Sequence, residues 1–165
     1  MSNSNFSKID IYTDASVWRD KQFFLFNYFS IAAIVVVDDN PVLHFSMSID
    51  MKKLLLRDES MADMSKLTLR GGFQPSARAE SYAIFHIIRR YFHKLDTKFG
   101  KHCLKTFWTD STYAKSRIDK RNFPGYGVLD INRILSNSNV DSKIIVSDSY
   151  KNCQGRIPIW NEQFH

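Results

Sequence analysis

Three acidic residues in this sequence stand where packing explains a carboxylate poorly. Asp14 and Asp110 each end a hydrophobic, strand-like run and are followed by small polar residues. Carboxylates are rarely buried unless they are paired or bind a metal, although each Asp could instead cap the following turn or helix. Glu80 continues the apolar stripe of a predicted helix, because Ala83 and Ile84 lie on the same helix face. A first-turn Glu favoured by the helix dipole is the alternative, and it explains the turn but not the face.

Two strand ends and one helix start can converge on a single point. Three carboxylates brought together repel one another unless cations neutralise them, and clustered oxygen ligands suit Mg²⁺ or Mn²⁺. Two such ions can activate a water molecule and stabilise the leaving oxygen of a phosphodiester. We therefore expect Asp14, Glu80 and Asp110 to be catalytic and metal-binding residues.

The elements that position these acids follow from the periodicity of the sequence. Alternation and β-branched or aromatic residues predict strands over residues 8–14, 31–37, 42–49, 103–109 and 143–146. The clearest helix begins after Ser76 and keeps an apolar stripe to Phe92, and shorter helices are predicted over residues 111–119 and 128–135. A further helix could start at residues 51–56. The order of elements predicts one α/β domain with a mixed sheet.

The three acidic motifs resemble those of the ribonuclease H family. They occur in the family's order, each on the expected kind of element: Thr13-Asp14-Ala15-Ser16, Ala79-Glu80 and Thr109-Asp110-Ser111. The resemblance covers roughly residues 8–165, and residues 1–7 are expected to be a flexible leader. It implies a five-stranded mixed sheet in the order 3-2-1-4-5 with helices on both sides. It also implies two Mg²⁺ or Mn²⁺ ions and endonucleolytic cleavage of the RNA strand of RNA–DNA hybrids.

The C-terminal part departs from the family's pattern. The family's fourth acid closes an Asn-Glu-x-x-Asp motif, whereas this sequence reads Asn161-Glu162-Gln163-Phe164-His165. His165 is a candidate fourth catalytic and metal-binding residue, because imidazole can ligate a metal or move a proton. The alternatives are a terminal His without a role and Asp148 as the fourth acid. The family's His-bearing loop is not visible in residues 147–159, and residues 17–30 and 50–73 are longer than in a compact member.

Basic residues follow the second acidic strand end. The sequence carries 23 Lys and Arg against 17 Asp and Glu, a net charge of +6, which suits a polyanionic partner. Cations mixed with aromatic residues can hold phosphates and stack on bases, although a solvated helix face explains the run equally well. The predicted nucleic-acid-binding residues are Ser16, Ser111, Lys115, Arg117, Lys120 and Arg121.

Cysteine usage and hydropathy indicate the compartment. Cys103 and Cys153 are far apart in the sequence and are typical of ordinary thiols in a reducing compartment. The N-terminal residues lack the apolar core of a signal peptide, and the longest apolar stretch, residues 31–37, is too short to span a bilayer. We expect a soluble, cytoplasmic protein that binds nucleic acid and does not associate with membranes. The sequence does not indicate a protein partner.

Three hypotheses about function follow. The leading one is a metal-dependent nuclease that cleaves RNA paired with DNA. The second keeps the fold and assigns a DNA-directed or structure-directed nuclease. The third is a catalytically weak scaffold domain that binds nucleic acid or protein. The missing fourth acid favours the third hypothesis, and the retention of three carboxylates that are costly to bury argues against it.

Overall fold

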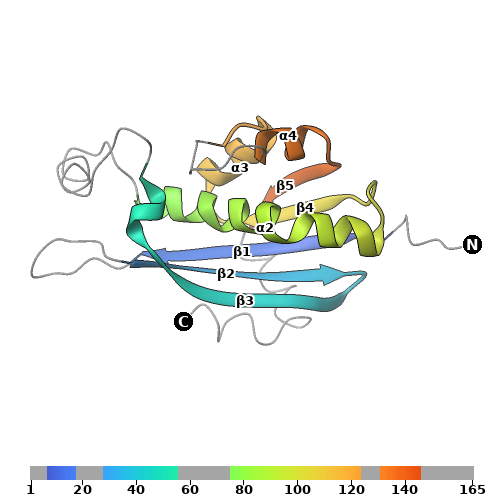
Figure 1. Ribbon diagram of the computed structural model, residues 1–165, viewed down its shortest axis with the longest axis horizontal. Helices are drawn as coiled ribbons and strands as arrows, with labels where there is room; N and C mark the ends of the chain where they lie inside the picture. The colour runs from blue at the N-terminus through green and yellow to red at the C-terminus, as the bar shows by residue number, and fades with distance from the viewer. Residues whose placement is uncertain (1–6, 18–27, 56–74, 124–130, 146–165) are drawn as a thin grey trace, which may run out of the picture.

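The protein folds around one five-stranded sheet (Figure 1). The computed structural model describes residues 7–17, 28–55, 75–123 and 131–145. The strands are β1 (Ile9–Val17), β2 (Tyr28–Val37), β3 (Asn40–Asp50), β4 (Lys105–Thr109) and β5 (Val140–Ile144). Their order is β3-β2-β1-β4-β5, antiparallel from β3 to β1 and parallel from β1 to β5. The mixed sheet and the 3-2-1-4-5 order expected from the sequence are confirmed.

The helices are η2 (Met51–Leu54), α2 (Pro75–Phe99), α3 (Thr112–Asp119) and α4 (Ile131–Ser136). The long helix α2 runs across β1 and β2, while α3 packs on β4 and β5 and α4 packs on α2 (Figure 1). Pro75 occupies the first helical position of α2, where its missing N–H costs nothing and its fixed φ suits the helix. Gly100, at φ 104°, follows the last residue, in a conformation that other residues adopt with difficulty. Within the described residues, no helix combines the length and the hydropathy needed to cross a membrane.

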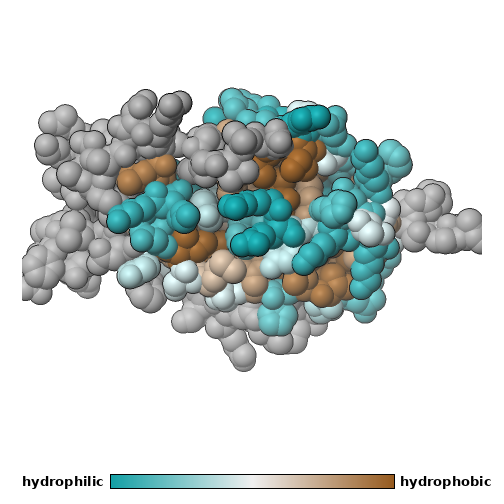
Figure 2. Space-filling model, viewed as in Figure 1, coloured by the Kyte–Doolittle hydropathy of each residue, from teal (hydrophilic) through white to brown (hydrophobic). Residues whose placement is uncertain are grey.

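The main core lies between α2 and the sheet. The apolar stripe predicted for α2 is buried here, with Ile84, Ile87 and Phe92 at most 2% exposed, and it meets Ile11 of β1 and Phe107 of β4. Burying each such side chain stabilises the fold by about 1.5–3 kcal/mol. Figure 2 shows the opposite side of α2 as a hydrophilic band across the middle of the molecule, with hydrophobic side chains beside it. The helix therefore lies on the sheet with one clearly defined face.

Several predicted elements differ from the structure. β1 continues to Val17, so Asp14 lies within this strand rather than at its end, although the pairing of β1 with β4 stops at Tyr12. The last strand begins at Val140 rather than at residue 143. The sequence did not predict this start because the polar Ser142 is buried and donates a hydrogen bond to Asp119 of α3. A polar residue with such a partner leaves no alternating apolar pattern in the sequence. The helix considered at residues 51–56 is a single 3-10 turn, η2. Of the longer segments expected at residues 17–30 and 50–73, residues 28–30 belong to β2, and residues 18–27 and 56–73 lie outside the described residues.

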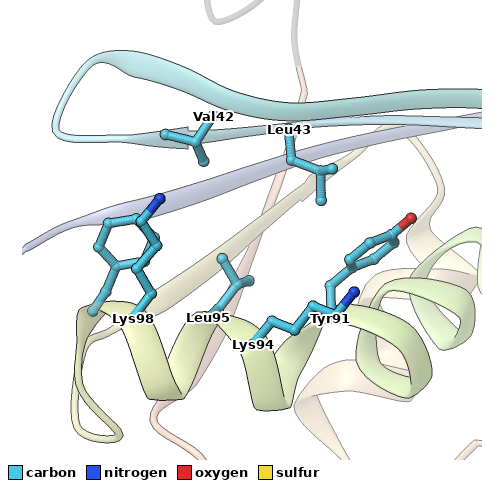
Figure 3. A pocket seen from close by; sticks show the side chains of 7 residues that line it. Val42, Leu43, Tyr91, Lys94, Leu95 and Lys98 are labelled. Atoms are coloured by element: carbon cyan, nitrogen blue, oxygen red, sulfur yellow. The ribbon is translucent and has the colours of Figure 1, made fainter.

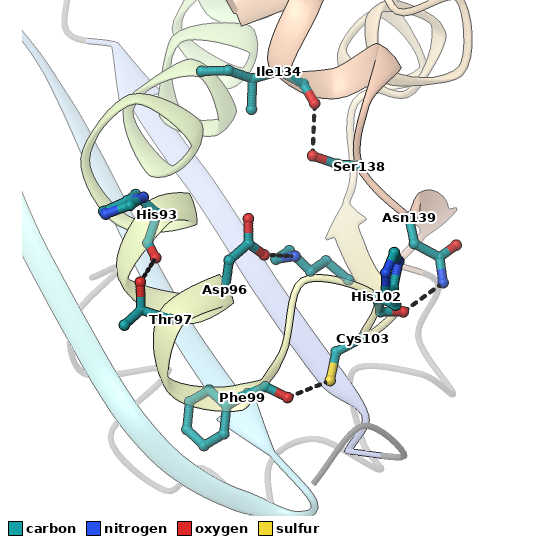
Figure 4. A network of polar contacts seen from close by, with 10 residues as sticks. His93, Asp96, Thr97, Phe99, His102, Cys103, Ile134, Ser138 and Asn139 are labelled. Atoms are coloured by element: carbon teal, nitrogen blue, oxygen red, sulfur yellow. Dashed lines mark hydrogen bonds and ion pairs between the residues drawn. The ribbon is translucent and has the colours of Figure 1, made fainter.

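The C-terminal end of α2 is joined to β4 and to the segment before it by polar contacts (Figure 4). Lys105 is fully buried at the start of β4, and its ammonium group pairs with Asp96 of α2 at 2.5 Å. The same ammonium group lies 5.0 Å from the centre of the Phe92 ring. The buried Cys103 thiol donates a hydrogen bond to the Phe99 carbonyl. These contacts fix the end of α2 that lies away from Glu80.

Candidate active site

Asp14 and Asp110 occupy matching positions on two adjacent parallel strands. The last paired residues of β1 and β4 are Tyr12 and Trp108, and each Asp follows two residues later in its own chain segment. The pairing offset is 96 residues for Tyr12 and Trp108 (108 − 12) and the same for the two Asp residues (110 − 14). Side chains two residues apart on a strand point to the same face. The register of one strand pair therefore brings both carboxylates to one place at the end of the sheet.

Glu80 reaches the same place from α2. Its position on the apolar stripe carries it toward the sheet, and the residue is only 7% exposed. The Oε2 atom is buried and has no hydrogen-bond partner among the described residues. Leaving a buried carboxylate oxygen without a partner costs about 1–3 kcal/mol or more. A buried carboxylate oxygen of this kind can accept a hydrogen bond or bind a cation.

The three carboxylates converge. One oxygen of each of Asp14, Glu80 and Asp110 lies within 4.8 Å of the other two. The backbone N–H of Ala15 donates to Asp14 Oδ1 at 2.9 Å and to Glu80 Oε1 at 3.1 Å. One donor thereby fixes one oxygen of each acid. The sequence gives no sign of this amide, because every residue except Pro carries the same backbone donor.

Burial and mutual repulsion shape the electrostatics of the cluster. Desolvation, followed by the charges of Asp110 and Asp14, raises the pKa of Glu80 from 4.5 to about 10. The hydrogen bond from Ala15 acts in the opposite direction and is outweighed. A carboxyl group with this pKa holds a proton at neutral pH. The proton relieves the same repulsion that a bound cation would relieve.

The donor set fits a small divalent cation. All three side chains offer oxygen, which Mg²⁺ and Mn²⁺ prefer. Oxygens bound at about 2.1 Å to one octahedral ion are about 3 Å apart when adjacent and about 4 Å apart when opposite. The 4.8 Å span of the cluster is therefore close to that of a shared site. The unpartnered Oε2 of Glu80 supplies a further ligand atom.

The backbone around Asp110 is held on both sides. Ser111 is the N-cap of α3, and its Oγ accepts a hydrogen bond from the Ala114 amide at 3.1 Å. The Ser111 amide donates to Thr109 Oγ1, and the Ile145 amide donates to the Thr109 carbonyl at 2.7 Å. A strand end and a helix cap thus meet at Asp110 and position its carboxylate. The predicted contact of Ser111 with nucleic acid stays a prediction beside this capping role.

Asp10, a further acid on β1, is buried but does not join the cluster, in which only Glu80 is buried. Asp10 is 3% exposed, and its carboxylate accepts a hydrogen bond from Trp108 Nε1 at 2.9 Å and lies 3.7 Å from Lys8 Nζ. It lies four residues before Asp14, about 13 Å along the strand. Trp108 also stacks on Tyr12, with ring centres 5.7 Å apart. Sequence reasoning did not single out Asp10, although the alternation of side chains along a strand places it on the same side of β1 as Tyr12 and Asp14.

The predicted basic contacts lie on α3 and just beyond it, and three of the four already have partners within the protein. Lys115 pairs with Asp119 at 2.7 Å and also donates to Ser142. Arg117 donates to the Asn122 carbonyl and stacks on Tyr113, while Arg121 donates to the carbonyls of Ile118 and Val140. These contacts favour structural roles, and Lys120 stands exposed beside them. Ser16 is exposed on β1, two residues beyond Asp14. For all of these residues, nucleic-acid binding stays a prediction.

His165 and Asp148, the two candidates for a fourth ligand, lie outside the described residues. The structure therefore brings together the three core acids, and the catalytic and metal-binding roles assigned to all four positions stay predictions.

Comparison with known proteins identifies the architecture. No protein-family model and no curated protein matches the sequence. Among solved structures, the foamy viral protease–reverse transcriptase in complex with an RNA/DNA hybrid matches 94% of this chain at 10% sequence identity, with a TM-score of 0.54. The matched region is 19% of that chain. LC11-RNase H1 in complex with an RNA/DNA hybrid is 15% identical over 86% of this chain and 87% of its own, with a TM-score of 0.48.

The fold is ribonuclease H-like. At these sequence identities the likeness concerns the fold. In this ribonuclease H-like chain the two Asp residues of the carboxylate cluster lie just past the C-terminal end of the β1–β4 pairing, where Glu80 of α2 meets them. Open α/β sheets bind ligands beyond the carboxyl ends of their strands. The cluster thus lies where a sheet of this kind binds ligands, and its three carboxylates are groups that can bind a cation.

Proposed function

We propose that this protein is a divalent-metal-dependent endonuclease that cleaves the RNA strand of RNA–DNA hybrids. The observation that carries the proposal is the convergence of one oxygen of each of Asp14, Glu80 and Asp110 within 4.8 Å, with Glu80 buried. Packing does not explain why a buried Glu80, whose pKa is raised by burial and by the charges of Asp110 and Asp14, stands beside two further carboxylates, whereas a cation site does. The hybrid as substrate is the finer part of the proposal and follows from the family resemblance.

The chain's own residues would act as follows. Asp14, Glu80 and Asp110 would hold the cations, and the Ala15 amide would keep two of the carboxylates in place before the cations arrive. Bound divalent ions supply an activated water and stabilise the leaving oxygen of a phosphodiester. Desolvation of Glu80 strengthens each electrostatic interaction in the cluster. Cation binding would displace the proton that Glu80 otherwise keeps.

The test is a cleavage assay on end-labelled substrates. Pure protein is incubated with an RNA–DNA hybrid, duplex RNA, single-stranded RNA and duplex DNA, each with Mg²⁺, with Mn²⁺ and with EDTA. We expect cleavage of the RNA strand of the hybrid only, and only with a divalent ion. The Asp110→Asn variant, purified in the same way, excludes a contaminating nuclease.

Two other outcomes would redirect the proposal. Cleavage of duplex DNA in place of the hybrid would assign the DNA-directed alternative. Binding of hybrid without cleavage of any substrate, under either ion, would leave the scaffold hypothesis in its place.

A further inference from the structure

β3 forms one edge of the sheet, and no other described strand lies on its outer side. Among the described residues, β3 hydrogen-bonds to β2 and to no other strand. The outer side of an edge strand presents backbone N–H and C=O groups to which another strand can add. Natural edge strands discourage such pairing with charged side chains, yet residues 40–49 contain no Asp, Glu, Lys or Arg. Residues 43–49, which follow Pro41 and the irregular pairing beside it, therefore carry no charged side chain that would oppose an added strand.

A β-bulge at Val42 opens an apolar groove between this edge and α2. The pairing register shifts between Val35 and Val36, which leaves Val42 as the extra residue of β3. A bulge re-aims a side chain, and Figure 3 shows Val42 and Leu43 both pointing toward α2. The groove has a volume of about 180 Å³, and its apolar lining consists of Val42, Leu43, Tyr91, Leu95 and Phe99.

The size and exposure of the groove indicate what it can accept. Its volume equals that of about six water molecules at about 30 Å³ each, which is enough for one apolar side chain. Val42 is 44% exposed, one of the largest exposures among the described hydrophobic residues. Figure 2 shows hydrophobic side chains next to the hydrophilic band of α2, toward β3. The groove is therefore accessible from the open side of the edge strand.

Cations border the groove. The ammonium groups of Lys94 and Lys98 lie 5.8 Å and 5.4 Å from the ring centres of Tyr91 and Phe99. Arg90 is exposed and lies four residues before Lys94, so the three cations share one face of α2 over about 12 Å. Within the described part of the chain, none of the three pairs with a carboxylate. The row therefore offers charge to an external partner.

We infer that this edge is a docking site for an extended, acidic segment of another protein, which adds to β3 as a strand and places one apolar side chain in the groove. Main-chain hydrogen bonds give affinity in such complexes, and pockets for alternate side chains give specificity. Pro41 and the bulge interrupt pairing at one end, so residues 43–49 are the stretch on which the segment would pair. A second copy of this chain fits poorly, because it would bring a second cationic row and a further net charge of +6 to the same place.

The probe for this inference is the peptide Glu-Ser-Glu-Ser-Leu-Ser-Glu-Ser-Glu, whose extended form carries four Glu and a central Leu on one face. Amide chemical shifts of isotope-labelled full-length protein are followed during titration. We expect shift changes confined to residues 43–49 and 91–99. The peptide with Lys in place of every Glu should bind about tenfold more weakly or not at all, because it meets the cationic row with like charge.

Matched variants separate this surface from general charge effects. Lys94→Glu with Lys98→Glu should weaken acidic peptide binding about tenfold, whereas the exposed control pair Lys101→Glu with Arg133→Glu, which changes net charge equally, should not. Equal binding of the acidic and basic peptides, shift changes elsewhere, or none at millimolar peptide would overturn the inference. So would a dimer in sedimentation equilibrium that Val42→Asp abolishes. These readouts do not involve the carboxylate cluster, and they are independent of the proposed nuclease activity.

Discussion

Asp14 and Glu80 accept hydrogen bonds from the same backbone amide, that of Ala15. The donor belongs to the main chain, so the link persists with any residue but Pro at this position. Each acid still has a second oxygen, and the Glu80 Oε2 is buried without a partner. The fold of the metal-free protein thus holds these carboxyl groups close together against their mutual repulsion. This repulsion can be measured through the pH dependence of the free energy of unfolding.

Glu80 should make the free energy of unfolding fall as pH rises in the metal-free protein. Its pKa rises from 4.5 unfolded to about 10 folded, so between these values the folded chain keeps a proton that the unfolded chain has lost. The contribution is complete below the lower value and is lost toward the upper one, by at most about 1.4 kcal/mol per pH unit. Glu80→Gln should flatten the profile in urea unfolding with EDTA at pH 5, 7 and 9. The exposed turn variant Asp39→Asn should keep the wild-type slope, and an unchanged slope in Glu80→Gln would refute this account.

Divalent ions should stabilise the folded protein through the cluster. Mg²⁺ or Mn²⁺ at about tenfold excess over its dissociation constant adds about 1.4 kcal/mol to the free energy of unfolding. Asp110→Asn should abolish both this increase and any cleavage without unfolding the protein. The Asp39→Asn control should keep both the increase and the cleavage. Thermal melts with and without ion measure the increase. An equal rise in Tm for the Asp110→Asn variant would place the ion elsewhere.

Sequence reasoning anticipated the three acids because each stands out against a regular pattern. Asp14 and Asp110 interrupt alternating strands, and Glu80 interrupts an apolar helix face. It placed β5 too late because Ser142 is satisfied by Asp119, and this pairing links residues 23 positions apart. The burial of Lys105 could not be predicted from the sequence either, because its partner Asp96 lies on another element. Long-range polar pairs and backbone donors leave no periodic trace in a sequence.

The Lys105–Asp96 and Lys115–Asp119 ion pairs should differ strongly in their effect on stability. Asp96→Asn leaves the fully buried Lys105 ammonium without a counter-charge, and we expect a loss of about 3 kcal/mol. Lys105→Met with Asp96→Asn should recover most of it, because an apolar replacement of similar volume removes the buried charge. Lys115 and Asp119 are 34% and 45% exposed, so breaking their pair by Lys115→Gln should cost less than about 1 kcal/mol. Chemical denaturation of all three variants decides, and equal losses would contradict the role of burial.

Lys120 and Arg121 are neighbours with different expected roles. Lys120 is exposed, so Lys120→Gln should weaken hybrid binding and leave the Tm unchanged. It should also lower the slope of log affinity against log salt concentration by about one. Arg121 donates to two backbone carbonyls, at Ile118 and Val140, so Arg121→Gln should lower the Tm. Fluorescence anisotropy at several salt concentrations and thermal melts separate the two effects. A normal salt slope in Lys120→Gln would remove this residue from the predicted nucleic-acid contacts.

His165 is the predicted replacement for the family's fourth acid. A nitrogen ligand suits Mn²⁺ better than Mg²⁺, so cleavage should favour Mn²⁺ and fall as the imidazole is protonated at acid pH. His165→Asp should raise Mg²⁺-supported cleavage, and His165→Ala should lower cleavage with either ion. If both variants keep the wild-type rates and ion preference while Asp148→Asn loses activity, Asp148 is the fourth ligand.

The register between β1 and β4 also determines when the cluster can exist. Its two Asp residues are separated by 96 positions in the chain, and neither contacts the other until two strands distant in sequence have paired. Contacts of such long range form late, because the entropy of closing the intervening loop must be overcome first. During synthesis Asp14 and Glu80 leave the ribosome well before Asp110 does. A nascent chain therefore carries no complete cluster, and the proposed cleavage could begin only after the domain has been made and folded.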